Sequence, residues 1–299
     1  MVSYLTLLKG IEEGDFKLLA RALTLVENDI APSLALLKSL KIKNSVPVLG
    51  ITGPPGAGKS TLVNAIAGFL VSQNKKIAIL AVDPTSPFNF GSLLGDRIRM
   101  AAQFNSPNVY IRSIATRGAL GGISVKTLEM LDILKASNFD LIIVETVGVG
   151  QSEVEIAGLA DKTMVVLVPE SGDEIQNIKS GLMEIANAFV VNKADREGAD
   201  IFCNNLKKLV NDSHQNLPVF KTVADKNLGI DKLCDWILTP TENDDYRKKL
   251  LVADKIFRII QHKRMQNLDK AVLIDALERA MNEPEFNAYK FAEQYTKTF

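Results

Sequence analysis

The sequence predicts an α/β protein in which helices flank a mostly parallel β-sheet, with helical extensions at both ends of the chain. From Val46 to about Leu238, short runs rich in Val and Ile alternate with stretches of helical periodicity, as in βαβ units. Several runs are apolar at consecutive positions, which is typical of a parallel sheet covered on both faces. Both flanking segments instead repeat apolar residues at helical spacing.

The first helical segment spans residues 4 to about 40, where Leu5, Leu8 and Ile11 begin an apolar series. It predicts two or three short helices, which the polar break 41–45 separates from the sheet. After the polar linker 239–245, residues 246–282 are expected to be helical again. In between, strands are expected at 47–52, 76–83, 109–115, 140–146, 163–169, 188–193 and 218–223.

The composition favours a globular protein of the reducing cytoplasm. The 35 Lys and Arg residues are matched by 35 Asp and Glu, which argues against a dedicated nucleic-acid or membrane-surface binder. Two cysteines and two histidines form no metal-binding pattern or disulfide framework. Because apolar runs are too short to span a bilayer and no signal peptide is evident, we expect a soluble, cytoplasmic protein.

A phosphate-binding loop follows the first strand and opens a helix. The segment GPPGAGKST, residues 53–61, has the glycine, lysine and serine spacing of this loop. Its glycines let backbone N–H groups turn toward phosphate oxygens, and the helix N-terminus adds partial positive charge. The lysine reaches the β and γ phosphates, and the serine ligates Mg²⁺. The centre is therefore predicted to be a P-loop NTPase, with nucleotide contacts from Gly53, Pro54, Pro55, Gly56, Ala57, Gly58, Lys59, Ser60 and Thr61.

A second motif indicates which base the site reads. VVNKAD, residues 190–195, ends a predicted strand with Asn192, Lys193 and Asp195. A carboxylate accepts two hydrogen bonds from the N1–H and exocyclic amine of guanine, whereas adenine has no matching pair of donors. The Asn192 amide can hold the backbone and ring edge, and the Lys193 stem can lie along the base. The sequence therefore predicts a GTPase.

An acid at the end of an apolar strand belongs to the same predicted site. In LIIVETVGVG, Glu145 ends the strand 140–146 and Gly148 follows it. If this strand is parallel to the one before the phosphate loop, its carboxyl end opens at the same edge of the sheet. Glu145 would then act near the γ-phosphate and Mg²⁺, and Gly148 would let a backbone N–H approach the phosphate. Most GTPases carry Asp here, and the extra methylene of Glu favours contact through water. The alternative is a surface acid paired with lysine.

Two more acids are candidate neighbours of Mg²⁺, which takes six oxygen ligands and usually keeps several waters. Asp83 ends the strand 76–83, and Asp96 follows a loop rich in Pro and Gly. The alternatives are a turn or N-cap for Asp83, and an N-cap or a salt bridge to Arg97 for Asp96. The loops 84–95 and 147–153 are the expected switch segments around the γ-phosphate.

Together these motifs resemble one family. The blocks GPPGAGKST, AVDPTSPFNFGSLLGDRIRM, ATRGALGGIS, VETVGVGQSE, SGDEIQNIKSGLMEIA and VVNKAD are similar to the MeaB/ArgK/MMAA family of G-protein chaperones for adenosylcobalamin-dependent methylmalonyl-CoA mutase. The likeness extends to GIEEGDFKLLARALTLVEN and covers most of residues 5–240. It implies a GTPase of the signal-recognition and metallochaperone branch, usually a homodimer. The residues that it brings to GTP and Mg²⁺ are Lys59, Ser60, Asp83, Asp96 and Glu145.

Two segments depart from the family pattern, and a third resembles one of its loops. Asn89-Phe90 stands where Thr-Gly is expected in the first switch, and Val223-Ala224 replaces Ser-Ala in the last guanine loop. The hydroxyl is lost there, although the Ala224 backbone N–H could still contact the guanine O6. Residues 171–181 resemble a mobile loop that communicates with the mutase, and the alternative is a solvated helix start.

The expected reaction is in-line attack of water on the γ-phosphate of GTP, with charge stabilised by Lys59, Mg²⁺ and backbone amides. Lys59, Glu145 and Gln151 are the catalytic candidates, although Gln151 is equally consistent with a polar residue at a helix start. No arginine finger can be assigned among Arg97, Arg99, Arg112 and Arg117. Hydrolysis by the free protein is therefore expected to be slow and to be raised by the partner.

The resemblance implies a protein that protects or gates cobalamin loading of an adenosylcobalamin-dependent acyl-CoA mutase. The expected domains are a helical extension, 1–44, a GTPase domain, 45–240, and a helical arm for dimerisation, 241–299. The alternatives are a GTP-dependent kinase of a protein or small molecule, a metallochaperone GTPase, and a regulatory module that binds nucleotide without turnover. No nucleic-acid or membrane partner is expected.

Overall fold

The computed structural model describes residues 3–43, 45–83, 106–115, 125–146, 156–170, 181–212, 217–240, 245–265, 268, 270–282 and 286–296. The chain divides into two compact units, 1–244 and 245–299. The predicted fold class is confirmed, because the first unit is an α/β structure around a parallel sheet. The domain boundaries expected from the sequence stay a prediction.

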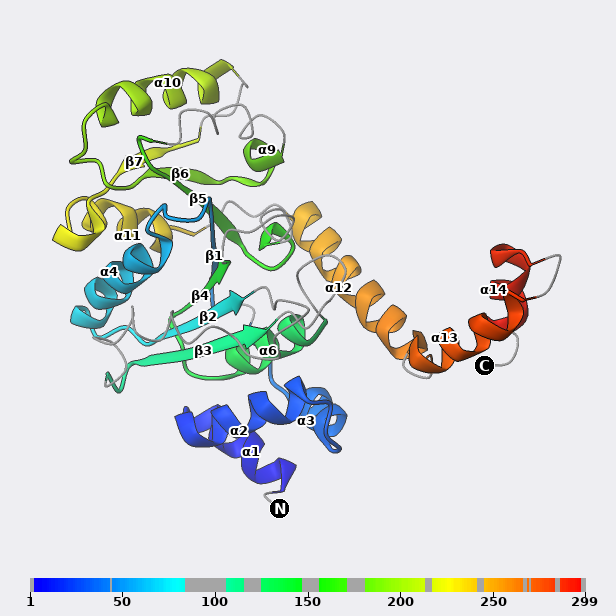
Figure 1. Cartoon of the computed structure of the whole chain (residues 1–299). Helices are drawn as coiled ribbons and strands as arrows, with labels where there is room; N and C mark the ends of the chain where they lie inside the picture. Colours follow the sequence, from blue (N-terminus) through cyan, green and yellow to red (C-terminus); the bar gives the residue numbers. More distant parts are fainter. Residues whose placement is uncertain are drawn as a thin grey trace. The chain divides into compact units, whose positions relative to one another are not determined.

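The described part of the first unit contains a seven-stranded sheet in the order β3-β2-β4-β1-β5-β6-β7, with every neighbouring pair parallel (Figure 1). All seven expected strands are present, and their ends differ from the predictions by at most two residues. The strands are β1 Val48–Thr52, β2 Ile77–Asp83, β3 Val109–Ala115, β4 Leu141–Thr146, β5 Lys162–Leu167, β6 Ala188–Val191 and β7 Val219–Lys221.

Helices bury both faces of this sheet, which explains why its strands are apolar at consecutive positions. On β2, Leu80 packs in one hydrophobic cluster and Ile79 in another. The cluster of Ile79 contains α4 and α11, whereas that of Leu80 contains α6 and the N-terminal helices. A third cluster joins β5 and β6 to α9 and α10. The helices are α4 Lys59–Ser72, α6 Val125–Ala136, α9 Met183–Ile185, α10 Ala199–Asp212 and α11 Ile230–Leu238.

The N-terminal segment forms three helices that share the core of the sheet. They are α1 Tyr4–Glu13, α2 Phe16–Glu27 and α3 Ser33–Ser39. Asp15 caps α2, since its Oδ1 accepts from the backbone N–H groups of Lys17 and Leu18 at 2.8 and 3.0 Å. The ring of Phe16 lies 5.4 Å from that of Tyr110 on β3. These helices are therefore a packed layer of the first unit.

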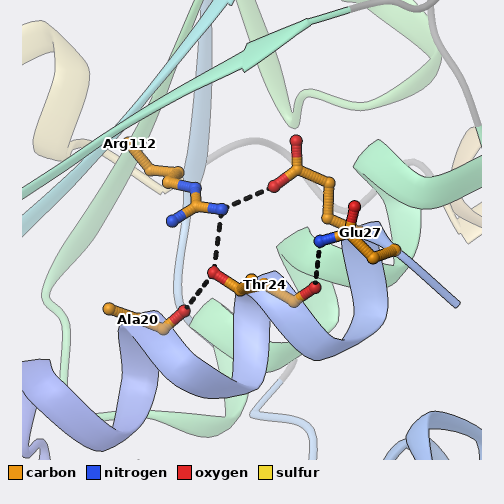
Figure 2. A network of polar contacts seen from close by, with 5 residues as sticks. Ala20, Thr24, Glu27 and Arg112 are labelled. Atoms are coloured by element: carbon orange, nitrogen blue, oxygen red, sulfur yellow. Dashed lines mark hydrogen bonds and ion pairs between the residues drawn. The ribbon is translucent and has the colours of Figure 1, made fainter. Parts of the chain in front are cut away.

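Ion pairs fix the C-terminal end of α2 to the sheet and to α6. Arg112 of β3 pairs with Glu27 and also donates to the Thr24 hydroxyl at 3.1 Å (Figure 2). Lys126 of α6 donates to Asp29 at 2.8 Å. Burial lowers the pKa of Lys126, but its hydrogen bonds to the carboxylates of Asp29 and Glu129 outweigh burial and raise that pKa. The charge on Lys126 is therefore secure at neutral pH.

The second unit consists of helices in its described parts, as the sequence predicts for 246–282. They are α12 Asp245–Met265, α13 Lys270–Ala280 and α14 Ala288–Thr296. The rings of Phe291 and Tyr295 stack at 5.6 Å, and Phe286 lies 6.1 Å from Phe291. Among the described helices of the chain, none is long and apolar enough to cross a membrane.

The shared core predicts that the N-terminal helices and the sheet unfold together. Leu19 of α2 is fully buried, so Leu19→Ala should lower the free energy of unfolding by about 2–5 kcal/mol through lost burial and a residual cavity. Leu34→Ala is the control, because Leu34 is 53% exposed and its truncation should cost within about 0.5 kcal/mol. Denaturant titration followed by circular dichroism measures both. A separate early transition, with the main one unmoved by Leu19→Ala, would contradict a common core.

Candidate functional site

The phosphate loop connects the end of β1 to the start of α4 at one edge of the sheet. Its backbone requires glycine at two positions. A Cβ on Gly53, whose φ is 140°, would lie 2.1 Å from the carbonyl oxygen of Val166. A Cβ on Gly58, whose φ is 82°, would lie 2.5 Å from the side-chain nitrogen of Asn192. The loop is thus pressed against β5 on one side and against the end of β6 on the other.

Lys59 lies across this loop. Its Nζ donates to the carbonyl oxygens of Gly53 at 2.7 Å and Pro54 at 2.9 Å, and the residue is only 7% exposed. The first N–H groups of a helix have no acceptor within the helix, and no described side chain caps α4. The loop therefore presents an ammonium group and the positive end of a helix at the same place, which is the arrangement that binds phosphate.

Ser60 and Glu145 meet beside the phosphate loop. The Ser60 hydroxyl donates to Glu145 Oε1 at 2.7 Å, and both residues are buried. Glu145 is paired in register with Ile51 of β1 and Ala81 of β2, so it lies at the same sheet edge as the loop. This position explains why an acid ends an otherwise apolar strand. Hydroxyl and carboxylate oxygens are also the donors that Mg²⁺ prefers, so these two residues fit the ion.

A pair of threonines joins the ends of the same two strands. Thr146 Oγ1 lies 3.1 Å from Thr52 Oγ1, and both side chains are fully buried. The hydrogen bond links β4, which carries Glu145, to the last residue of β1 before the phosphate loop. The sequence motifs do not identify this contact. It becomes visible only when β4 is placed beside β1.

Asn192 connects three segments at the other end of the loop. Its Nδ2 donates to the carbonyl oxygen of Ala57 at 3.0 Å. Its Oδ1 accepts from the Thr222 hydroxyl at 3.1 Å and from the Ala224 backbone N–H at 3.2 Å. Asn192 is 2% exposed. The Ala224 N–H, which the sequence suggests for guanine O6, is thus directed at Asn192 in this structure, and Thr222 is a supporting residue that the motif does not reveal.

Lys193 and Asp195 follow Asn192 at the surface. Lys193 has a φ of 54° and donates through Nζ to the carbonyl oxygen of Gly56 at 2.7 Å. Asp195 is exposed and forms an ion pair with Lys226 at 2.7 Å. The hydrogen bond from Lys226 holds the pKa of Asp195 below its usual value. Asp195 is therefore an open, ionised acceptor, and Lys226 is a second residue that the motif alone does not reveal.

The remaining predicted residues lie outside what the structure describes, in whole or in part. The backbone of Asp83 ends β2 at the same sheet edge, beside β3, but its side chain is outside the described part. Asp96, Gly148 and Gln151 are also outside the described residues, as are 84–95, 147–153 and 171–180. Their roles stay predictions. Among the arginines considered as fingers, Arg112 is paired with Glu27 and so is already used in the fold.

The arrangement is a phosphate loop with its lysine, a buried serine–carboxylate pair at one end and an exposed carboxylate at the other. It suits a nucleoside triphosphate whose base is read by an acid. The family model described as methylmalonyl Co-A mutase-associated GTPase MeaB matches residues 19–282, most of the chain. The chain belongs to the MeaB family. The resemblance found in the motifs is thereby confirmed, and the protein is a GTPase that binds guanine nucleotide.

Relatives from several organisms support this membership. A protein of Pyrococcus abyssi, named as a GTPase, is 46% identical over 239 residues, which are 77% of this chain and 74% of the relative. GTPase ArgK of Escherichia coli is 31% identical over 305 residues, covering 94% of this chain and 87% of the relative. The crystal structure of a LAO/AO transport system kinase has a TM-score of 0.64 at 26% identity and covers 100% of this chain and 92% of its own.

The geometry at Asp195 predicts a switch in base preference. In Asp195→Asn the amide keeps one acceptor but presents N–H groups to the exocyclic amine of guanine, so GTP affinity should fall on the order of 100-fold. Xanthosine triphosphate has a carbonyl at that position and should bind more tightly to the variant than GTP does. Titration with labelled nucleotides measures both affinities.

The control for this substitution is Asp200→Asn, because Asp200 is also exposed and paired with a lysine, Lys221. Its nucleotide affinities should equal those of the wild type. If Asp195→Asn bound GTP as tightly as the wild type does, Asp195 would not read the base.

Proposed function

We propose that this GTPase is a chaperone that protects or gates cobalamin loading of an adenosylcobalamin-dependent acyl-CoA mutase. The observation that carries the proposal is a phosphate loop whose Lys59 and Ser60–Glu145 pair meet at one edge of the sheet, in a chain of the MeaB family, whose description names a mutase partner. The chain has no part in the cobalamin chemistry itself. Cobalamin is the cofactor of the client, and GTP is the ligand of the chaperone.

GTP is proposed to lie along the edge of the sheet from Asp195 to Glu145. Asp195 accepts from the guanine N1–H and amine, while Asn192 keeps the base segment against Ala57 of the phosphate loop. Lys59 exchanges its two carbonyl acceptors for oxygens of the β and γ phosphates. A charged donor on phosphate oxygens stabilises the charge that shifts during phosphoryl transfer.

Mg²⁺ fits the oxygen donors beside the loop, with Ser60 as ligand and Asp83, Asp96 and Glu145 as nearby carboxylates. When bound, the ion neutralises charge on the β and γ phosphates. Glu145 holds the Ser60 hydroxyl at 2.7 Å, which leaves the lone pairs of the serine oxygen to face a ligand. We propose that Glu145 acts on the ion in this indirect way, while Gln151 stays a candidate for orienting water.

The nucleotide state is proposed to reach the client through the segments that follow the site strands. Residues 84–95 follow Asp83 on β2, and residues 147–153 follow Glu145 and Thr146 on β4. A ligand shifts a conformational equilibrium only by binding one state better than the other, and the γ-phosphate is the group that differs between GTP and GDP. Residues 171–181 are proposed as the loop that contacts the mutase.

A phosphotransferase is the second candidate, because the similar crystal structure is titled a transport system kinase. The two functions differ in where the γ-phosphate goes. A kinase transfers it to an acceptor, whereas the chaperone releases it to water as inorganic phosphate. Labelled GTP distinguishes the two products in one reaction, with the mutase present or absent.

Phosphate release with and without the client tests the proposed function. The purified chain should hydrolyse GTP slowly, and an equimolar adenosylcobalamin-dependent acyl-CoA mutase from the same organism should accelerate release by about tenfold or more. Lys59→Ala should abolish both rates, since it removes the ammonium that contacts the phosphates. Turnover that no mutase changes would contradict the client, and label on an acceptor would favour the kinase.

We also propose that the second unit pairs two copies of the chain. Helix α12 exposes Val252, Ile256 and Ile260 at four-residue spacing, together with Phe257, which is 66% exposed. An apolar stripe of this kind on a helix usually marks an interface. A second copy of the same helix would cover the stripe in an isologous contact.

Light scattering tests this pairing. The wild type should have the mass of a dimer, and Phe257→Asp combined with Ile260→Asp should shift it to monomer by placing charge in an apolar interface. Ile201→Asp is the control, since Ile201 on α10 is 69% exposed and lies in the first unit. A monomeric wild type, or a dimer that survives the double change, would contradict the proposal.

A further inference from the structure

The N-terminal helices carry an open groove that is lined by none of the residues assigned to nucleotide. It has a volume of about 500 Å³ and is formed by α1, α2 and the residues between α2 and α3. Most of its lining is apolar, including Leu7, Leu25 and Pro32. Ile30 also lines it and is 48% exposed. A folded protein usually buries such residues, so an apolar groove that remains open is a candidate interaction site.

One charged side chain lies in this apolar lining. Arg21 is the only charged residue among those that line the groove, and its side chain is exposed. It makes no ion pair with any residue that the structure describes. The groove therefore complements a group that is apolar at its tip and negatively charged beside it. Arginine in an apolar setting is also a residue type that often dominates binding energy at protein interfaces.

The wall of the groove is held rigidly. Thr24 lines the groove, donates to the carbonyl oxygen of Ala20 at 3.0 Å, and accepts from Arg112 at 3.1 Å (Figure 2). Arg112 is in turn paired with Glu27 one turn further along α2. The carbonyl of Thr24 also accepts from the Asn28 side chain at 2.9 Å. Because these contacts fix α2 to β3, the groove exists before a partner arrives, which lowers the entropic cost of binding.

The form of the groove favours a side chain of another protein over a small molecule. Small-molecule sites bury most of their ligand. Here Arg21, Thr24, Ile30 and Ala31 are all exposed along the lining, so a small ligand would remain largely in water. A partner protein would cover the exposed rim with its own surface while one apolar side chain fills the groove.

We propose that this groove is a docking site for the client mutase, which inserts an apolar side chain flanked by a carboxylate that pairs with Arg21. This inference rests on the proposed function and adds a contact outside the nucleotide site. The same wall is bonded to β3 through Arg112, and β3 leads through residues 116–124 to α6. Lys126 at the start of α6 is paired with Asp29, the second residue after α2. Helix α2 and the residues after it are thus bonded to β3 through Arg112 and to α6 through Lys126.

Three variants test the groove without touching the nucleotide site. Arg21→Glu reverses the charge and should weaken binding of the purified mutase by about tenfold or more, whereas Arg21→Lys keeps the charge and should stay within a few-fold of the wild type. Ala20→Trp fills the groove and should weaken binding to a similar extent. Lys207→Glu on α10 is the control for the charge change, since Lys207 is exposed and forms no ion pair with the described residues.

Calorimetry with the mutase gives the affinities, and GTP affinity together with thermal unfolding shows that each variant is folded. Loss of mutase binding in Arg21→Glu and Ala20→Trp, with Lys207→Glu unchanged, is the expected result. If the mutase binds the wild type and both groove variants equally, the groove inference is overturned and the chaperone function stands. If the mutase does not bind the wild type, the inference and the proposed function fail together.

Discussion

The geometry of the nucleotide site depends on the hydrogen bonds of the buried Asn192 amide. This amide donates to the phosphate loop at Ala57 and accepts from Thr222 and from the backbone of Ala224, so one side chain sets the spacing of three loops. Asn192 is nearly inaccessible to water, and a buried polar group that lost one of these partners would carry the full cost of its desolvation. The absence of a side chain at Gly58 follows from the same contact, because a Cβ there would collide with the amide. The distance between the phosphate end and the base end of the site is therefore built into the core of the sheet.

The other end of the site is built by the neighbouring strands β1 and β4. Parallel pairing brings the carboxyl ends of both strands to one edge, where Thr52 and Thr146 bond and Glu145 receives the Ser60 hydroxyl. A change at the γ-phosphate would thus reach Ser60 and, through its hydrogen bond, Glu145, whose strand β4 leads directly into the proposed switch segment 147–153. The N-terminal helices are joined to the same unit by the ion pairs of Arg112 on β3 and Lys126 on α6. The nucleotide site and the N-terminal helices are thus both bonded to strands of the same sheet.

The predictable part of the fold is the part that local pattern encodes. Strands β1, β4, β5 and β6 are buried apolar runs because helices cover both faces, so their existence can be read from neighbours in sequence. The predicted ends of β6 and β7 lie two residues beyond the observed ones. Strand β6 stops where Asn192 turns toward the phosphate loop, and β7 stops before the bridge between Val223 and Leu228. The phosphate loop and the base motif could be predicted for a similar reason, because the spacing of their residues along the chain determines which groups meet the nucleotide. Thr222, Lys226 and the Thr52–Thr146 pair could not be, because each acts through a residue distant in sequence. The groove at Arg21 belongs to the same class, since it needs the packing of α1 and α2 and the turn after them.

A crystal structure of the chain with Mg²⁺ and a non-hydrolysable GTP analogue would test the proposed site most directly. We expect Lys59 to leave the carbonyls of Gly53 and Pro54 for the phosphates, and Asp195 to contact the guanine. We also expect Ser60 to ligate Mg²⁺ while still donating to Glu145, so that Glu145 does not ligate the ion itself. Direct ligation of the metal by Glu145, with the Ser60 hydrogen bond broken, would contradict the proposed role of this pair. A nucleotide bound away from Asn192 would contradict the site as a whole.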